Sequence, residues 1–167
     1  MKNITRALLV LTLLALAACD FHLRGSNLKD ITFAFKTLYV KAPGESAFVV
    51  DLRRALKLNK IDVAPSIDKA DLVLEVVSEH ATKQILSLSA SGRVLEYQLF
   101  YRVSLRAYDI NRDDWLPAEE IAMSRIMSYD NSAILAMEQE EAALFKDMRS
   151  DAVGQALRRL NKAKPHQ

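Results

Sequence analysis

The stretch from Arg93 to Tyr108 constrains the fold of this chain more than any other, because its side chains alternate with a period of two. From Leu95 onward its odd positions are apolar, and its even positions are mostly polar. The apolar set is Leu95, Tyr97, Leu99, Tyr101, Val103, Leu105 and Ala107, and the other set is Glu96, Gln98, Phe100, Arg102, Ser104, Arg106 and Tyr108. Successive side chains of a strand point to opposite faces. The alternation therefore predicts a long strand with one buried face.

The segments around this strand predict the rest of the domain. Residues 71–88 predict a second long strand, and the turn at Ser91-Gly92 joins the two strands into a hairpin. Residues 36–42 and 120–128 predict two more strands, the latter after a turn at 111–114. Ser46 can cap a helix that ends near residue 60.

A second helix is predicted from Asp130-Asn131-Ser132, which supply N-cap groups, to about Asn161. Acidic residues lie in its first half and basic residues in its last turns, as the helix dipole favours. Its expected buried side is Ile134, Glu138, Ala142, Phe145, Met148, Ala152, Leu157 and Leu160.

The order of elements is β-α-β-β-β-α, and the apolar face of such a sheet needs a cover. Short turns join the last three strands, so those strands should be antiparallel. We expect an α+β fold, a two-layer sandwich with two helices packed on one face of a four-stranded, mostly antiparallel sheet.

The N-terminal residues resemble the signal peptide of a bacterial lipoprotein. Lys2 and Arg6 precede an apolar run over 7–16 that is too short to span a bilayer. The run ends in Leu16-Ala17-Ala18-Cys19, a lipobox that contains the only cysteine of the chain. Cys19 is therefore the predicted lipid attachment site, carrying a diacylglyceryl thioether and an N-acyl chain. The expected organisation is a removed signal over 1–18, a lipidated tether over 19–35, a domain over 36–162 and a flexible tail over 163–167.

Charge and cysteine content exclude several classes of function. The chain has 23 Lys and Arg against 21 Asp and Glu, and removal of Lys2 and Arg6 makes the two counts equal. A neutral domain has no field to attract nucleic acid. One lipidated cysteine allows neither an internal disulfide nor a thiolate metal site, and the three histidines lack the spacing of metal ligands. We expect no metal and no other cofactor.

Motifs for catalysis are missing from the sequence. The glycines are too dispersed for a phosphate loop, and no serine has the G-x-S-x-G frame. A periplasmic hydrolase is left as a minor alternative that would depend on His80 and Glu96, although both are more simply read as solvated strand residues.

Cations beside aromatic rings mark the polar face of the predicted sheet. Arg102 and Arg106 alternate with Phe100 and Tyr108 on one strand. We expect Arg93, Lys83 and Arg125 on neighbouring strands or at their ends. Charge-assisted bonds beside apolar surface suit an amphiphilic, phosphorylated ligand, while an ordinary solvent-facing surface or a protein–protein surface is the alternative.

Motifs along the whole mature chain resemble the LPS-assembly lipoprotein family, LptE, also known as rare lipoprotein B. Cys19-Asp20-Phe21-His22-Leu23-Arg24-Gly25 is similar to the family start C-G-[FW]-H-L-R-[GD]. Further matches follow in order: Lys36-Thr37-Leu38-Tyr39-Val40, Gly92-Arg93-x-x-Glu96-Tyr97-x-Leu99, Arg125, Tyr129-Asp130-Asn131, Gln139 to Arg149, and Arg158-Arg159-Leu160.

The resemblance implies a protein without enzymatic activity, anchored by lipid to the periplasmic side of the Gram-negative outer membrane. It implies that the protein plugs the lumen of the LPS-assembly β-barrel LptD, supports its assembly and helps to deliver lipopolysaccharide to the cell surface. It also implies direct binding of lipopolysaccharide, for which Arg93 is the first candidate and Lys83 and Arg125 follow. Two helices on a four-stranded sheet are the family fold.

Two residues depart from the family pattern. Asp20 follows the cysteine where the family usually has glycine, and aspartate there resembles an inner-membrane retention signal. The alternative is therefore an accessory lipoprotein of an inner-membrane lipid transporter. Met137 replaces a lysine that some members carry early in the last helix, so their basic ligand-binding set does not carry over as a whole.

Overall fold

The computed structural model describes residues 33–164, and these contain five strands and two α-helices. The predicted signal peptide, Cys19 and Asp20 lie outside the described residues. The elements follow in the order β1 (Thr37–Lys41), α2 (Ala47–Leu58), β2 (Asp62–Val63), the 3₁₀ turn η2 (Ile67–Lys69), β3 (Leu72–Leu88), β4 (Val94–Asp109), β5 (Asp114–Ser128), the 3₁₀ turn η3 (Asn131–Ala133) and α3 (Ile134–Lys162).

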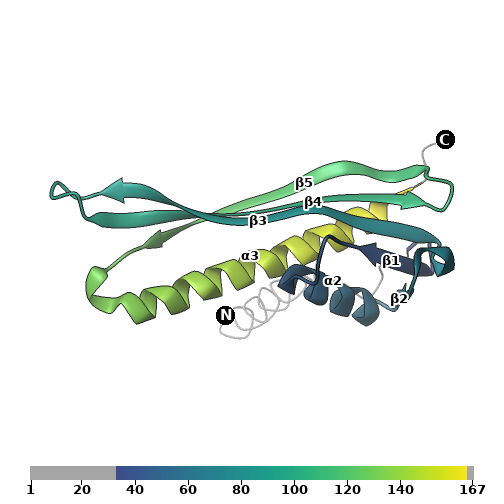
Figure 1. The fold of residues 1–167 in the computed structure, drawn as a ribbon, viewed down its shortest axis with the longest axis horizontal. Coiled ribbons are helices and arrows are strands. Elements are labelled where there is room, and N and C mark those ends of the chain that lie inside the picture. Colours follow the sequence, from purple (N-terminus) through teal and green to yellow (C-terminus); the bar gives the residue numbers. More distant parts are fainter. Residues whose placement is uncertain (1–32, 165–167) are drawn as a thin grey trace, which may run out of the picture. The chain divides into compact units, whose positions relative to one another are not determined.

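The strands form one sheet in the order β2-β1-β3-β4-β5, and both helices lie on the same side of it (Figure 1). β3, β4 and β5 are antiparallel to one another, and β1 is parallel to both β2 and β3. The predicted α+β sandwich is confirmed. The strand count is five rather than four because β2 has only two residues, too few to show a period.

The last strand, β5, begins six residues earlier than predicted, at Asp114 instead of 120. Its first part contains Pro117, which has no N–H for a neighbouring strand. β5 is an edge strand, and a proline is tolerated there.

Helix α2 forms as its sequence predicts. The Ser46 side chain accepts a hydrogen bond from the backbone N–H of Val49 at 3.2 Å and so caps the first turn. The helix buries one stripe: Phe48, Val49, Leu52 and Leu56. Asp130 behaves differently from the prediction, because its carboxylate accepts from Ser132 and caps η3, while α3 itself begins at Ile134.

Helix α3 is buried only in its second half. Met148, Ala152, Leu157 and Leu160 lie in the core as predicted. Ile134, Glu138 and Ala142 are exposed, and Phe145 is half-buried, so this part of the prediction is wrong. β1 pairs with β3 only from Leu72 to Glu75, so the sheet beyond this point contains only β3, β4 and β5. The first half of α3 accordingly has less apolar surface to cover.

The core extends slightly beyond the predicted domain boundaries. Phe35, expected in the tether, is 6% exposed and packs at 6.3 Å from the Trp115 ring. Ala163, expected in the tail, is also 6% exposed. The packed unit therefore includes residues on both sides of 36–162.

Candidate functional site

The face of the sheet that no described helix covers carries the even-numbered side chains of β4. Arg102 stacks over the Phe100 ring at 5.6 Å, and Arg106 stacks over the Tyr108 ring at 5.2 Å. Each guanidinium thus lies against an aromatic face, an arrangement that stabilises a cation. The predicted alternation of cations and rings on this surface, called here the outer face, is confirmed.

A row of three charges crosses the outer face near β1. Glu75 bonds Lys41 at 3.0 Å on one side and Arg106 at 2.6 Å on the other. Partial burial tends to raise the pKa of Glu75, but the bonds from Lys41 and Arg106 outweigh it and keep that pKa below its ordinary value. A cavity of about 470 Å³ opens beside this row. Both cations of the row bond the same carboxylate, so the row keeps one net positive charge.

Lys83 and Arg125 lie on the opposite face of the sheet, and their predicted place beside Arg102 is wrong. Both are register partners of Leu99, which is fully buried and faces the helices. The register of β3 shifts between Val76 and Ser78, so Val77 is an extra residue and the side chains from Ser78 to Ile85, where the register shifts again, change face. The bulge therefore moves Lys83 to the helix side.

On the helix side, both cations bind α3. Lys83 pairs with Glu141 at 2.5 Å and lies over the Tyr97 ring at 4.9 Å. The hydrogen bond to Glu141 raises the pKa of Lys83, against a smaller lowering by burial. Arg125 pairs with Asp151 at 3.1 Å. The Lys83–Glu141 pair ties the first half of α3, which has little buried surface, to the sheet, and the Arg125–Asp151 pair adds a contact in its second half.

Arg93 lies apart from the other two candidates, at the turn between β3 and β4. Gly92 precedes it with φ +78°, a backbone conformation that side chains disfavour. The Ser89 hydroxyl accepts from the backbone N–H of Arg93 at 3.0 Å, which fixes the turn. Within residues 33–164, Lys83 and Arg125 thus lie in the same cross-strand row, on either side of Leu99. Arg93 lies apart from them, at the end of the hairpin.

The two residues considered for hydrolysis have ordinary surroundings. His80 is exposed on the outer face, opposite Arg102 in the register. Glu96 accepts a hydrogen bond from the Ser87 hydroxyl at 2.7 Å. No three His, Cys, Asp or Glu side chains come together as metal ligands in the described part of the chain.

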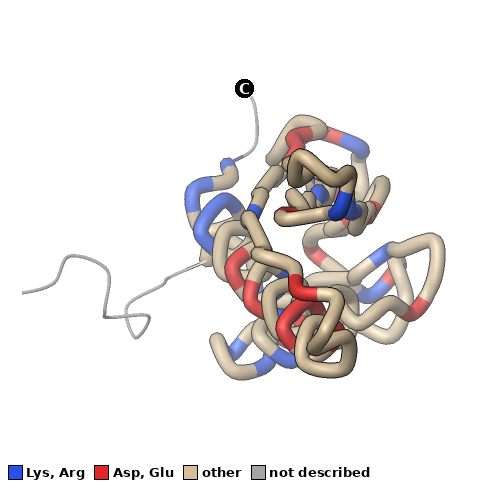
Figure 2. The backbone as a smooth tube through the Cα atoms, turned by 90° about the vertical axis from the view of Figure 1, so that its left-hand side faces the viewer, with Lys and Arg blue, Asp and Glu red and all other residues tan. Residues whose placement is uncertain are grey.

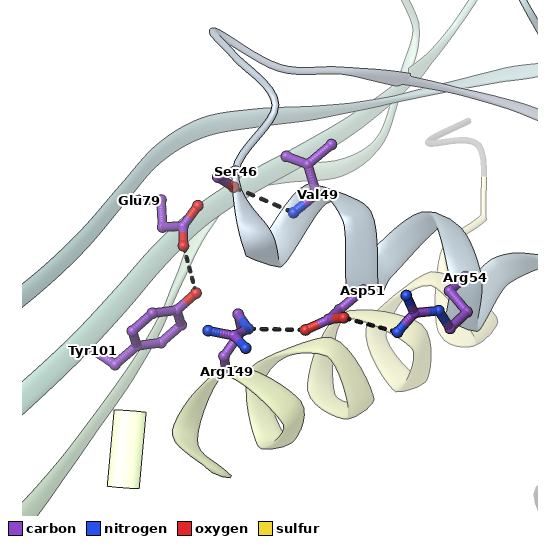
Figure 3. A network of polar contacts seen from close by, with 7 residues as sticks. All are labelled: Ser46, Val49, Asp51, Arg54, Glu79, Tyr101 and Arg149. Carbon is purple, nitrogen blue, oxygen red and sulfur yellow. Dashed lines mark hydrogen bonds and ion pairs between the residues drawn. The ribbon is translucent and has the colours of Figure 1, made fainter. Parts of the chain in front are cut away.

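Two polar contacts that the sequence did not indicate lie in one region of the structure, one within the sheet and one between the two helices (Figure 3). The buried Tyr101 hydroxyl donates to Glu79 at 2.7 Å. Arg149 of α3 donates to Asp51 of α2 at 2.8 Å. The period of β4 already indicated that Tyr101 faces inward, and a buried tyrosine needs a partner for its hydroxyl. The identity of that partner depends on the bulge at Val77.

Charge is distributed unevenly along α3. Its early turns carry Glu138, Glu140 and Glu141, and its last turns carry basic residues. In Figure 2, Lys and Arg segments lead up to the C-terminal end of the chain. None of the described helices combines the length and the apolar character needed to cross a membrane.

The sequence of the folded region matches one known protein family. The model of the LptE family, described as lipopolysaccharide-assembly, matches residues 35–160, which span the sheet and both helices. The chain belongs to the LptE family. The LPS-assembly lipoprotein LptE of Pectobacterium atrosepticum is 24% identical over 152 residues, covering 90% of this chain and 80% of that protein. The Yersinia pestis protein of the same name is 26% identical over 159 residues, covering 95% and 75%.

Solved structures of LptE-like lipoproteins share the fold. An uncharacterized lipoprotein B from Nitrosomonas europaea is 35% identical, with a TM-score of 0.71 over 83% of this chain and 88% of that one. The rare lipoprotein B of Shewanella oneidensis is 24% identical, with a TM-score of 0.65 over 73% of this chain and 91% of that one. The predicted membership in the LptE family is confirmed, and the role of the family is lipopolysaccharide assembly.

Proposed function

We propose that this protein is an outer-membrane lipoprotein that plugs the β-barrel LptD, supports the assembly of that barrel and assists the insertion of lipopolysaccharide at the cell surface. The observation that carries the proposal is the family match, which covers residues 35–160 and so nearly all of the packed domain. The proposed role is structural and involves no catalysis. It requires no cofactor apart from the acyl chains.

The two faces of the sheet suit this role. The lumen of a large membrane barrel is polar. The outer face presents charges and hydroxyls, including the row formed by Lys41, Glu75 and Arg106, and no described helix lies on it. The opposite face is closed by α2 and α3. Such a domain can contact a polar wall without exposing its core.

Cys19 is the proposed anchor, with a diacylglyceryl group on sulfur and an acyl chain such as palmitate on nitrogen. One chain alone gives weak, reversible membrane binding, and several chains together give stable anchoring. The anchor would hold the domain on the periplasmic side of the outer membrane, within reach of a barrel in the same membrane.

Co-purification from detergent-solubilised membranes tests the proposal. A tag on this protein should recover a large β-barrel protein in equal amount. The matched control is Cys19→Ala, which removes the acyl chains and leaves the described domain unchanged. Recovery of the lipoprotein alone, from cells that make the barrel, would contradict the proposed complex.

Asp20 favours a second candidate, an accessory lipoprotein of an inner-membrane lipid transporter. The two candidates place the protein in different membranes, so fractionation separates them. The protein in the outer-membrane fraction supports the barrel complex. The protein in the inner-membrane fraction, with Asp20→Gly moving it outward, supports the transporter.

Direct binding of lipopolysaccharide remains assigned to Arg93, Lys83 and Arg125 as a proposal. Arg93 is exposed at the hairpin turn, whereas the other two must exchange Glu141 and Asp151 for a phosphate. We therefore expect Arg93→Gln to weaken binding of purified lipopolysaccharide more than Lys83→Gln or Arg125→Gln. Unchanged binding in the triple variant would place the ligand elsewhere.

A further inference from the structure

The last turns of α3 carry a cluster of cations that has no role in the proposed barrel contact. Between Ala152 and Lys164 the sequence contains four Lys and Arg residues and no Asp or Glu. In Figure 2, Lys and Arg segments gather beside the C-terminal end of the chain. Three of these residues are exposed and are called here the basic end of α3: Arg158, Lys162 and Lys164.

The three cations of the basic end are available for an external anion. None of them forms an ion pair within residues 33–164. Arg159 is already bound, because its Nη1 lies 3.1 Å from the Glu119 carboxylate and its Nη2 donates to the Glu120 carbonyl at 3.2 Å. A groove of about 260 Å³ on this part of the helix has a lining without any carboxylate. Its lining is Gln155, Arg158, Arg159 and Lys162.

The helix dipole alone does not account for this cluster. Basic residues in a last turn complement the dipole when they lie near its free carbonyl groups. Arg158 points away from those groups, because a Cβ atom placed on Gly154, one turn earlier, would lie 3.3 Å from Arg158 Nη1. Lys164 lies beyond the last helical residue, Lys162. The absence of a side chain at Gly154 thus leaves room for a guanidinium on the side of the helix.

Helix α3 runs antiparallel to β5, which places its basic end near the start of that strand. Asp151 pairs with Arg125 at 3.1 Å, and further along the helix Arg159 bonds the backbone carbonyl of Glu120 at 3.2 Å. The helix therefore passes the residues of β5 in decreasing order. Its last turn approaches the beginning of β5 at Asp114.

The chain enters the packed domain at the same end. Phe35 packs at 6.3 Å from the ring of Trp115, the second residue of β5, and Phe33 packs at 5.4 Å from Phe35. Cys19, the proposed anchor, precedes Phe33 by 14 residues, which span at most about 50 Å when fully extended. The acidic start of α3 is about 44 Å from its basic end, the length of a 29-residue helix.

We propose that the basic end of α3 binds the anionic phospholipid surface of the membrane in which Cys19 is anchored. The lipid phosphates would bond the three exposed cations, and the same surface would repel the acidic residues at the start of the helix. The domain would therefore stand with the basic end toward the bilayer and the hairpin turn at Gly92 away from it. The inference rests on the proposed anchor, and it does not depend on the barrel complex.

Co-sedimentation with vesicles tests the inference on the complete mature chain, residues 19–167, carrying Cys19→Ala. That substitution removes the acyl chains, so any binding comes from the polypeptide. The chain should bind vesicles of equal parts phosphatidylcholine and phosphatidylglycerol much more strongly than vesicles of phosphatidylcholine alone, and added salt should weaken the binding. Equal binding to the two kinds of vesicle would overturn the proposal. No barrel is present, so this result is separate from that of the co-purification.

Lys162→Gln and Lys146→Gln form a matched pair, because each removes the charge of one exposed lysine of α3. The two positions are 16 residues and so about 24 Å apart along the helix, more than two screening lengths at physiological salt. A cation near an anionic surface strengthens binding about five-fold. Lys162→Gln should therefore weaken binding to the anionic vesicles about five-fold, and Lys146→Gln should weaken it less than about two-fold. Thermal unfolding will check that both variants fold like the parent chain.

The triple variant Arg158→Gln, Lys162→Gln and Lys164→Gln should bind the anionic vesicles about 100-fold more weakly than the parent chain. Unchanged binding by this variant would overturn the proposal. So would an equal loss in the two single lysine variants, which would indicate a general effect of surface charge. Glycerol 3-phosphate at the phosphate concentration of the vesicles should not displace the protein. Displacement would indicate a site for a free phosphate and would overturn the assignment to a membrane surface.

Discussion

Removing the hydroxyl of Tyr101 tests whether its hydrogen bond to Glu79, which joins β4 to β3 beside the helices, stabilises the fold. The Tyr101 side chain is 3% exposed, and its hydroxyl donates to the Glu79 carboxylate at 2.7 Å. Tyr101→Phe keeps the ring in the core and deletes only this bond. Glu79 is half-buried, so water can reach part of its carboxylate after the change.

The expected cost follows from these surroundings. A hydrogen bond to a charged group contributes about 1.5–3 kcal/mol, and partial rehydration of Glu79 reduces that to about 1–2 kcal/mol. A domain of this size has a free energy of unfolding of about 5–15 kcal/mol. The variant should therefore unfold at a temperature lower by roughly 4 °C for each kcal/mol lost.

Urea denaturation of the wild type, Tyr101→Phe, Glu79→Gln and the double variant measures the interaction. The double-mutant cycle should give a coupling energy of about 1 kcal/mol between the two side chains. The unfolding slope should be the same in all four proteins, because no apolar surface is removed.

A pH series adds a second check. Burial, followed by the bond to Glu79, raises the pKa of Tyr101 above its ordinary value of 10.0. Folding therefore favours the neutral phenol, so this stabilisation is complete below pH 10 and decreases as the pH rises further. Phenylalanine cannot ionise, so the difference in free energy of unfolding between the wild type and Tyr101→Phe should be smaller at pH 11 than at pH 7. The raised pKa values of Lys41 and Lys83 affect both proteins alike. A coupling energy near zero, or a stability difference that does not change with pH, would refute this account of the Tyr101–Glu79 bond.

Three further changes test other parts of the fold by urea denaturation. Met148→Ala should lower the free energy of unfolding by about 2–5 kcal/mol, because the side chain is fully buried. Leu135→Ala, at a site that is 69% exposed, should lower it by less than about 0.5 kcal/mol. Equal costs would show that the first half of α3 is packed as tightly as the second. Gly92→Ala should cost about 1 kcal/mol because of its positive φ, whereas Gly44→Ala, with open space around it, should be nearly neutral. Asp71 accepts from two backbone amides at the start of β1, chiefly that of Thr37, and these bonds lower its pKa. Its stabilisation is present above pH 4 and is lost as the pH falls, so Asp71→Asn should cost about 1 kcal/mol at pH 7 and less at pH 2.5.

Periodicity over long segments predicted most of the sheet. The alternation along β4 placed Leu99, Tyr101 and Val103 in the core, because burial of one face imposes a period of two on such a strand. Ser46 predicted the start of α2 through a local bond that needs no tertiary information. Two-residue β2 was missed, since its existence depends on pairing with β1 and not on its own sequence.

The faces of the candidate cations could not be predicted, for a specific reason. Counting by two from Leu74 in β3 places Lys83 on the face opposite to Leu74, and the extra residue at Val77 reverses that assignment. A bulge of this kind arises from pairing between strands, and Val77 itself is an ordinary strand residue. The burial of α3 could not be predicted from its own sequence either. Its first half looks amphipathic, but the sheet beside it contains fewer strands and so offers less apolar surface to cover.

The parallel pairing of β1 with β3 has a consequence for the order in which the chain folds. Leu38 is the partner of Leu72, so about 34 residues must form a closed loop before these two strands can bond. β3, β4 and β5 are joined by short turns and pair with their neighbours in the chain. Local contacts form faster than distant ones. Among the strands of residues 33–164, β1 is synthesised first, yet it is expected to join the sheet after the three-stranded meander has formed.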